Sequence, residues 1–214
     1  MEKAAALVAQ ADAALKDTAL PPTERTSIAI RLLQRAAAHY ALARAFRDAA
    51  ETHQLAARHA LSIDAPCTSA KEHADAGVAF SRTATHRLQA LDEWAEASRL
   101  YEAQQRWASA ASQQIRIIEL CVSEKRLPQA IEACERAATL YDLDRCHGTA
   151  AQQRERAAWL CLDAGELAQA QAYFKRALKV YATKGDMGDK TSQLAHQIAL
   201  CSSSSSNSST TSKI

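Results

Sequence analysis

The sequence predicts an all-α protein, an α-solenoid of stacked helical hairpins with a repeat of about 40 residues. Three observations support this fold class. Ala, Leu, Glu, Gln and Arg are abundant among the 214 residues, and only five Gly and four Pro are present, which favours helix almost throughout. Apolar residues follow the helical spacing i, i+4, i+7 and i+11. The stripes that they form return at a constant interval along the chain, as expected when similar helical units stack on one another.

The clearest stripe lies in the segment AQAYFKRALKVY, residues 170–181. The same pattern occurs one and two repeat lengths earlier and, in a weaker form, three repeat lengths earlier. The four copies are Ala170, Phe174, Ala177, Tyr181; Ala130, Cys134, Ala137, Tyr141; Ala90, Trp94, Ala97, Tyr101; and Ala50, Gln54, Ala57, Leu61. Because the chain holds only five tyrosines, three of them at this spacing carry more weight than the matching alanines.

A second stripe alternates with the first and supplies the other helix of each hairpin. Its large apolar members, which are expected to fill the gaps between layers, are Tyr40, Phe80, Leu120, Leu160 and Leu200. Three cysteines follow at the next position, Cys121, Cys161 and Cys201, and are predicted to be small buried apolar residues. No two of the six cysteines have CxxC spacing, so neither a zinc site nor a disulfide framework is expected. The pair Cys146-His147 is interpreted as structural.

The elements can be placed in order from these stripes and from proline and glycine. A first helix is expected over residues 2–16, and Pro21-Pro22 separates it from a second, for which Thr23 or Thr26 is expected to be the N-cap. Further helices are predicted near residues 45–63, 68–82, 88–101, 107–121, 128–141, 150–161 and 166–181, then a loop at 184–189 and a last helix through Cys201. The domain organisation is one repeat domain, residues 1–201, and a serine-rich tail, residues 202–214, expected to be disordered.

Composition excludes several classes of function. The net charge of +2 does not favour nucleic acid or a strongly anionic membrane as a partner. No apolar run approaches the roughly 18 residues of a membrane span, and the N-terminus lacks a signal-peptide pattern, so a soluble intracellular protein is expected. The seven histidines form no HExxH, and no Gly-rich phosphate loop occurs. We therefore expect neither an enzyme nor a cofactor.

Two resemblances to known families follow from these segments. Residues 157–178 resemble the tetratricopeptide consensus, with small Ala158, Gly165 at the turn between helices, and then the stripe of Ala170 and Phe174. Four segments, at matched order and spacing over roughly residues 1–181, resemble the soluble NSF attachment proteins (SNAPs), whose hairpins have about this longer period. They are AAALVAQADAALK, SAKEHADAGVAF, LQALDEWAEASRLYEAQQRWASAA and LPQAIEACERAATLY.

The SNAP resemblance implies an adaptor that binds SNARE bundles and recruits the NSF ATPase for their disassembly in vesicle transport and membrane fusion. Because SNARE bundles present acidic surfaces, basic residues are the candidate contacts. They are Arg82, Arg106, Arg116, Arg154 and Arg156. Arg116 and Arg156 lie one repeat length apart and are expected at equivalent places in successive repeats. The alternative for each arginine is an ordinary solvated helix face.

The resemblance also implies contact with a membrane and with the ATPase. SNAPs carry a Phe-rich loop between their first two helices, where this chain has Ala19 and Leu20 before Pro21, so only a weak peripheral contact is expected. Their C-terminal region, which stimulates the ATPase, has no counterpart ahead of the serine tail. A cytoplasmic protein, peripheral on vesicle, Golgi or ER membranes, is expected. The alternative function is a general tetratricopeptide-type scaffold that binds a peptide or helix in its concave groove.

Overall fold

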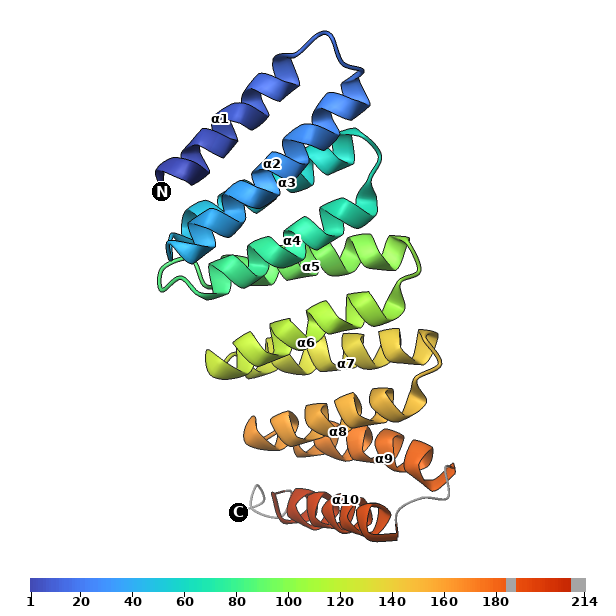
Figure 1. The fold of residues 1–214 in the computed structure, drawn as a ribbon. Coiled ribbons are helices and arrows are strands. Elements are labelled where there is room, and N and C mark those ends of the chain that lie inside the picture. Colours follow the sequence, from blue (N-terminus) through green and yellow to red (C-terminus); the bar gives the residue numbers. More distant parts are fainter. Residues whose placement is uncertain (184–187, 209–214) are drawn as a thin grey trace. The chain divides into compact units, whose positions relative to one another are not determined.

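The computed structural model describes residues 1–183 and 188–208, and this part of the chain contains ten α-helices and no strand (Figure 1). In chain order the helices are α1 Glu2–Lys16, α2 Pro22–Leu42, α3 Phe46–Ser62, α4 Pro66–Ser81, α5 Gln89–Ala103, α6 Trp107–Ser123, α7 Leu127–Leu143, α8 His147–Asp163, α9 Leu167–Thr183 and α10 Gly188–Ser208. The prediction of an all-α protein is therefore confirmed, and α1 has the predicted bounds.

The chain forms two compact units, Met1–Arg106 with α1 to α5 and Trp107–Ile214 with α6 to α10. Within each unit, every helix packs against the next helix along the chain, and the two run in opposite directions (Figure 1). Each unit is therefore a stack of antiparallel hairpins. This arrangement confirms the predicted class, an α-solenoid of tetratricopeptide-like hairpins, in both units.

The first repeated stripe forms the core of both units. Trp94 and Tyr101 in the first unit, and Phe174 and Tyr181 in the second, are each less than a tenth exposed. All eight stripe alanines are fully buried, so the helix backbones approach closely and the aromatic rings fill the remaining space. The fourth copy is weaker in the structure as well, because its last member, Leu61, is 45% exposed.

The second stripe is buried at three of its five positions. Phe80, Leu120 and Leu160 are buried and Tyr40 is half-buried, but Leu200 is 46% exposed. The expectation for Leu200 was therefore wrong. The reason is that α10 presents its face of Leu194 and Cys201 to the core, and Leu200 lies off that face.

The repeat-matched cysteines have the predicted role. Cys121, Cys161 and Cys201 are buried, as is Cys134 of the first stripe. Burial raises the pKa of Cys134 to about 12 and that of Cys161 to about 11, so these thiols stay protonated at neutral pH. They therefore act as small apolar side chains. Cys67 and Cys146, in contrast, are exposed.

The turns between helices repeat as regularly as the stripes. Left-handed backbone conformation occurs, among the described residues, at Arg44, Asp64, Gln105, Lys125, Arg145 and Gly165. Each follows the end of a helix and makes the same two hydrogen bonds. At the fourth of these turns, the Lys125 amide donates to Val122 O at 3.1 Å, and the Arg126 amide donates to Cys121 O at 2.8 Å. This pair of bonds is the Schellman motif, which satisfies the last carbonyls of the helix.

Only Gly165 among these six residues adopts the left-handed conformation without steric cost, because it lacks a Cβ. We therefore expect Lys125→Gly to raise the free energy of unfolding by about 0.5–1 kcal/mol. Gly165→Ala should lower it by about 1 kcal/mol, through the backbone alone, since nothing lies within 4 Å of a Cβ built there. Urea unfolding measures both. The control is Lys125→Ala, and a Lys125→Gly variant no more stable than this control would contradict the explanation.

The ADAG segment of α4 is shaped by the ring of Trp94 on α5. The Trp94 Nε1 donates to Ala74 O at 3.2 Å, which satisfies the buried indole N–H. Gly77 lies one turn further along α4, and a Cβ built on it would come within 2.5 Å of Trp94 Cδ1 and 2.9 Å of Cε2. Glycine is therefore required here by the close approach of α4 to the indole.

Gly77→Ala should lower the free energy of unfolding by about 1–3 kcal/mol from overpacking, even though alanine is the better helix former. The steric origin of this loss of stability can be tested in a Trp94→Leu background, where the indole ring is absent. There the penalty for Gly77→Ala should shrink or change sign, as a double-mutant cycle by chemical denaturation would show. An equal penalty in both backgrounds would refute a clash with Trp94.

Two expectations about element ends differ from the structure. Neither Thr23 nor Thr26 caps α2, which begins at Pro22 with Pro21 as N-cap and no side-chain cap. The Thr26 hydroxyl instead donates to Pro22 O at 2.8 Å. Proline suits the first helical position because its fixed φ is helical and its missing N–H has no partner there in any case.

At the other end of the chain, α10 continues to Ser208, past the predicted start of the disordered tail at residue 202. The Ser202 hydroxyl donates to Ile198 O at 2.9 Å and accepts a hydrogen bond from Gln171 Nε2, which ties this turn of α10 to α9. The remaining tail residues, 209–214, lie outside the described part of the chain. So does most of the predicted loop, residues 184–187.

Candidate functional site

Two of the five candidate arginines, Arg82 and Arg106, belong to the first unit and lie at its surface. The Arg82 guanidinium lies 5.6 Å from the ring centroid of Phe46, and that of Arg106 lies 5.3 Å from the ring of Tyr101. Arg106 Nη1 also donates to Cys67 Sγ at 3.3 Å. Cation–π contacts of this kind hold the charged groups in place while leaving them at the surface. The side chains of Arg82 and Arg106 are therefore held at the surface of the first unit by contacts within it.

The other three arginines lie in the second unit and do not share one face. Arg116 on α6 is exposed, and Arg156, its equivalent on α8, is half-buried. Arg154 is only 8% exposed, and its guanidinium donates to the carboxylate of Asp142 on α7. Two residues along a helix correspond to a rotation of about 200°, so Arg154 and Arg156 point in opposite directions. Arg154 therefore packs between α7 and α8.

Asp142 joins Arg154 to the Cys146-His147 pair. His147 Nδ1 lies 2.9 Å from the second oxygen of the Asp142 carboxylate. Burial on its own would raise the pKa of Asp142, but the hydrogen bonds from Arg154 and His147 outweigh burial and hold the pKa below its usual value. The prediction that Cys146-His147 is structural agrees with this contact.

Asp142→Asn should lower the free energy of unfolding by about 1–3 kcal/mol at pH 7, because it leaves the buried Arg154 without its charged partner. A folded-state pKa below the usual value means that this contribution is present above about pH 4 and is lost as pH falls through the lowered pKa. The difference in free energy of unfolding between the variant and the parent chain should therefore shrink on acidification. Urea unfolding at pH 7 and pH 3 tests this, with exposed Glu132→Gln on α7 as control. A difference that persists unchanged at pH 3 would contradict it.

The candidate membrane loop joins α1 to α2 and has little apolar surface. Ala19 is exposed, and its amide donates to Asp17 Oδ1 at 2.9 Å. Leu20 is half-buried, so only part of its side chain is available. In the part of the chain that the structure describes, no helix has the length and apolar character needed to cross a membrane.

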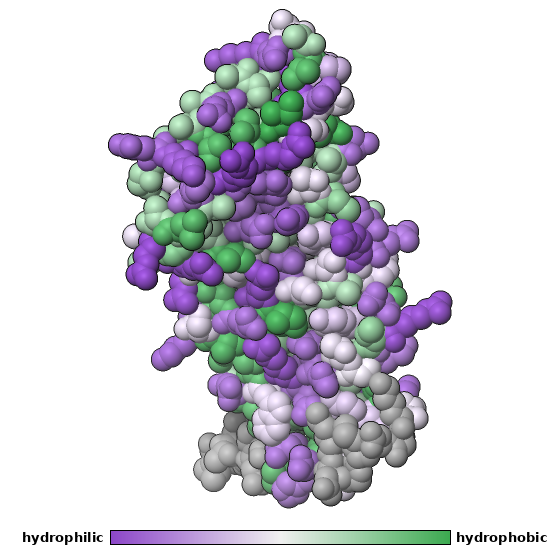
Figure 2. Space-filling model, viewed as in Figure 1, coloured by the Kyte–Doolittle hydropathy of each residue, from purple (hydrophilic) through white to green (hydrophobic). Residues whose placement is uncertain are grey.

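The surface in Figure 2 is mainly hydrophilic, and its apolar areas are small and separated from one another. The first unit also contains an open cavity of about 400 Å³ between α2 and the turn from α3 to α4. Its lining residues are Ser27, Ile30, Arg31, Gln34, Ile63, Ala65 and Thr68. The sequence did not predict this cavity, because its walls come from two segments that are distant along the chain.

Two layers of polar side chains, each centred on a buried glutamate, lie in the first unit, and sequence reasoning missed them. In one, Glu72 on α4 accepts from Gln34 Nε2 on α2 at 2.7 Å, and its other oxygen lies 2.7 Å from His53 Nδ1 on α3. In the other, Glu93 on α5 accepts from Gln54 on α3 at 2.5 Å and lies 2.7 Å from His73 on α4. The second layer repeats the first one helix later. The only trace in the sequence is that equivalent residues of the two layers lie about half a repeat length apart, 20 residues for the glutamines and histidines and 21 for the glutamates.

Stacked antiparallel hairpins with a regularly spaced turn after each helix place the protein among the tetratricopeptide-like helical-repeat proteins. The sequence profile of one family with this architecture, described as soluble NSF attachment protein, SNAP, matches residues 2–200. The chain therefore belongs to the SNAP family. This finding confirms the resemblance noted from the sequence.

No curated protein matches the chain. Among solved structures, BtubC (BKLC) from P. vanneervenii is 12% identical, with a TM-score of 0.49, and the match covers 96% of this chain and 84% of that one. A protein named as a putative kinesin light chain from Podosopora anserina, with nearly identical TPR-like repeats, is 14% identical, with a TM-score of 0.43 and coverage of 96% and 99%. Similarities this weak carry no conclusion about function.

Proposed function

We propose that the protein is a SNAP-type adaptor that binds assembled SNARE bundles and recruits an NSF-type ATPase for their disassembly in vesicle transport. The observation that supports this most is the family match over residues 2–200, which spans all ten helices except the end of α10. The family match supports the proposed function, and the exposure of the candidate arginines supports the choice of contact residues. Among the candidate arginines, Arg82, Arg106 and Arg116 have the most accessible guanidinium groups.

The physical basis of the proposed binding is electrostatic attraction to an acidic bundle. Exposed guanidinium groups raise the rate of encounter and fix the register, and they add less to the final affinity. Arg82 and Arg106 rest on the rings of Phe46 and Tyr101, so less side-chain freedom is lost when they bind. Arg156 contributes through its exposed half. Arg154 acts indirectly in this proposal, by holding α7 and α8 together through Asp142.

The proposed location is the cytoplasm, with peripheral contact to transport membranes through the bound SNARE bundle. Ala19 and Leu20 offer little apolar area for insertion into a bilayer, because Leu20 is half-buried. The loop therefore adds only a weak contact of its own. In this proposal the protein reaches the membrane mainly because it binds a SNARE bundle that is anchored there.

A second candidate function, a scaffold that binds a peptide, is favoured by the cavity of the first unit. Its apolar residues Ile30 and Ile63 could accept a side chain, while Arg31 could meet a carboxylate. This function predicts binding of an extended peptide or single helix and no preference for an assembled four-helix bundle. A pull-down with assembled bundles and with the isolated SNARE segments distinguishes the two.

The adaptor proposal predicts retention of the recombinant chain on assembled SNARE bundles at low salt. Arg82→Ala and Arg116→Ala should each lower the association rate constant by roughly two- to fivefold and weaken its salt dependence, because each removes one accessible charge. Their stability should change by less than about 0.5 kcal/mol. Surface plasmon resonance on immobilised bundles at several salt concentrations measures the rates.

The matched control is Lys179→Ala, which removes an exposed charge from α9. If Lys179→Ala lowered the association rate equally, only the net charge of the chain would matter. Arg82 and Arg116 would then no longer be assigned as contacts of the bundle. No retention at low salt would count against the adaptor function as a whole. A parallel ATPase assay with NSF reports whether the chain also stimulates disassembly.

A further inference from the structure

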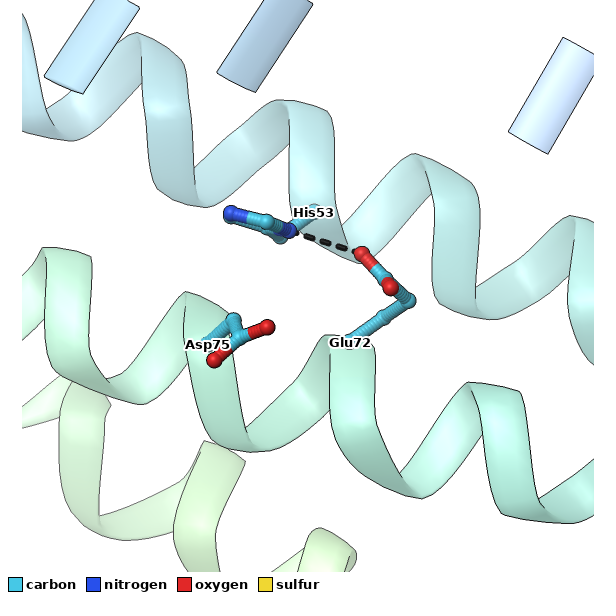
Figure 3. Close-up of side chains that lie close together, drawn as sticks. All are labelled: His53, Glu72 and Asp75. Atoms are coloured by element: carbon cyan, nitrogen blue, oxygen red, sulfur yellow. Dashed lines mark hydrogen bonds and ion pairs between the residues drawn. The ribbon is translucent and has the colours of Figure 1, made fainter. Parts of the chain in front are cut away.

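Three potential metal ligands converge within the first unit, in the layer of Glu72. Figure 3 shows Glu72 and Asp75 projecting from successive turns of α4 and His53 reaching toward them from α3. One ligand atom from each residue lies within 4.8 Å of the other two. Because the residues stand on two helices packed against each other, the backbone holds them in place before any ligand binds.

The surroundings of Glu72 are those of a supported metal ligand. Its side chain is 1% exposed, and a carboxylate removed from water to this degree requires compensation by a positive charge or several hydrogen bonds. Gln34 Nε2 donates to Glu72 Oε1 at 2.7 Å and fixes the plane of the carboxylate. Such a neighbour orients a ligating carboxylate and leaves the other oxygen directed at the centre of the cluster. That oxygen is the one nearest to His53.

The second polar layer provides an internal comparison. Its equivalents are His73, Glu93 and Glu96, which lie 20, 21 and 21 residues after His53, Glu72 and Asp75. There Arg99, one turn after Glu96, donates two hydrogen bonds to it, at 2.6 and 2.8 Å, and lowers its pKa. In the first layer the residue one turn after Asp75 is Val78. At matched positions the second layer thus has an arginine on its own helix and the first layer has a valine.

We propose that His53, Glu72 and Asp75 form a binding site for one divalent transition-metal cation, with Zn²⁺ as the best match. One imidazole nitrogen and two carboxylate oxygens form a mixed donor set that Zn²⁺ accepts, and two carboxylates balance its charge. The three residues leave at least one position for water. Gln34 is then a positioning residue, and the layer of Glu93, in which Arg99 binds Glu96, serves as an internal comparison.

Metal binding would replace the hydrogen bond between His53 and Glu72 with bonds from both side chains to the ion. His53 Nδ1 and Glu72 Oε2 are 2.7 Å apart, a hydrogen-bond distance, whereas two ligands on a tetrahedral zinc ion lie about 3.3 Å apart. A small rotation of the side chains therefore opens the site, and the proton between them leaves. Binding should weaken in acid, because protons compete with the metal ion for its ligands. The ion would join α3 to α4 and so stabilise the folded first unit.

The test uses the full chain with Cys67→Ser and Cys146→Ser as parent, because exposed thiols bind zinc on their own. Co²⁺ serves as a spectroscopic probe, and Zn²⁺ is added in competition and by titration calorimetry. The donor variants are Asp75→Asn and His53→Gln, since glutamine at position 53 can still donate to Glu72 and preserve the fold. The matched control is Glu96→Gln in the second layer.

We expect saturable binding of one Co²⁺ per chain at neutral pH, its displacement by Zn²⁺, and a rise in Tm on adding Zn²⁺. Asp75→Asn and His53→Gln should each weaken binding at least tenfold, with unchanged far-ultraviolet circular dichroism and metal-free Tm, while Glu96→Gln binds as the parent does. Absence of saturable binding overturns the proposal. So does equal binding by Asp75→Asn and Glu96→Gln. Failure of SNARE binding in the earlier experiment leaves this test unaffected.

Discussion

Close contact between alanine-rich helix faces is the constraint on which the rest of the structure depends. Ala97 and Ala177, like the other stripe alanines, are completely buried, so neighbouring backbones lie near one another and leave room for only a few large rings. A single hairpin of this composition has little apolar area to bury, which is why each must stack on the next. The requirement for glycine at residue 77 is one local consequence, because the ring of Trp94 occupies the space beside it.

Close packing also determines how polar side chains inside each unit behave. Glu72 in the first unit and Arg154 in the second are both less than a tenth exposed, and each is paired with a residue on a neighbouring helix. A buried charge without such a partner would destabilise the fold by several kcal/mol. The pairings therefore select one register of helix against helix. Apolar stripes of small residues alone would specify that register less strictly.

The division between accessible and buried arginines links the fold to the proposed function. Arg82, Arg106 and Arg116 reach solvent, whereas Arg154 maintains the packing of α7 against α8. A basic residue in a helical repeat can thus serve a partner or the core, and the helical angle between two positions decides which. Under the proposed adaptor function, the accessible arginines would supply steering and register for an acidic partner, and the buried pairs would keep each hairpin stack rigid.

The sequence by itself determined the fold class, nearly all the helix positions and the core, whereas the tertiary structure decided which polar residues meet. Repeated residues such as Tyr101 and Tyr181 encode periodicity, and periodicity fixes which face of each helix is apolar. The turns were less visible, because five of the six left-handed positions are occupied by residues such as Lys125, which carry no glycine signal. Gln34 and Glu72 come from different helices and are distant along the chain, so no local pattern reports their contact. Helix formation is governed by interactions within a few residues, but the partner of a buried charge is set by the stacking of helices, which brings together distant parts of the chain.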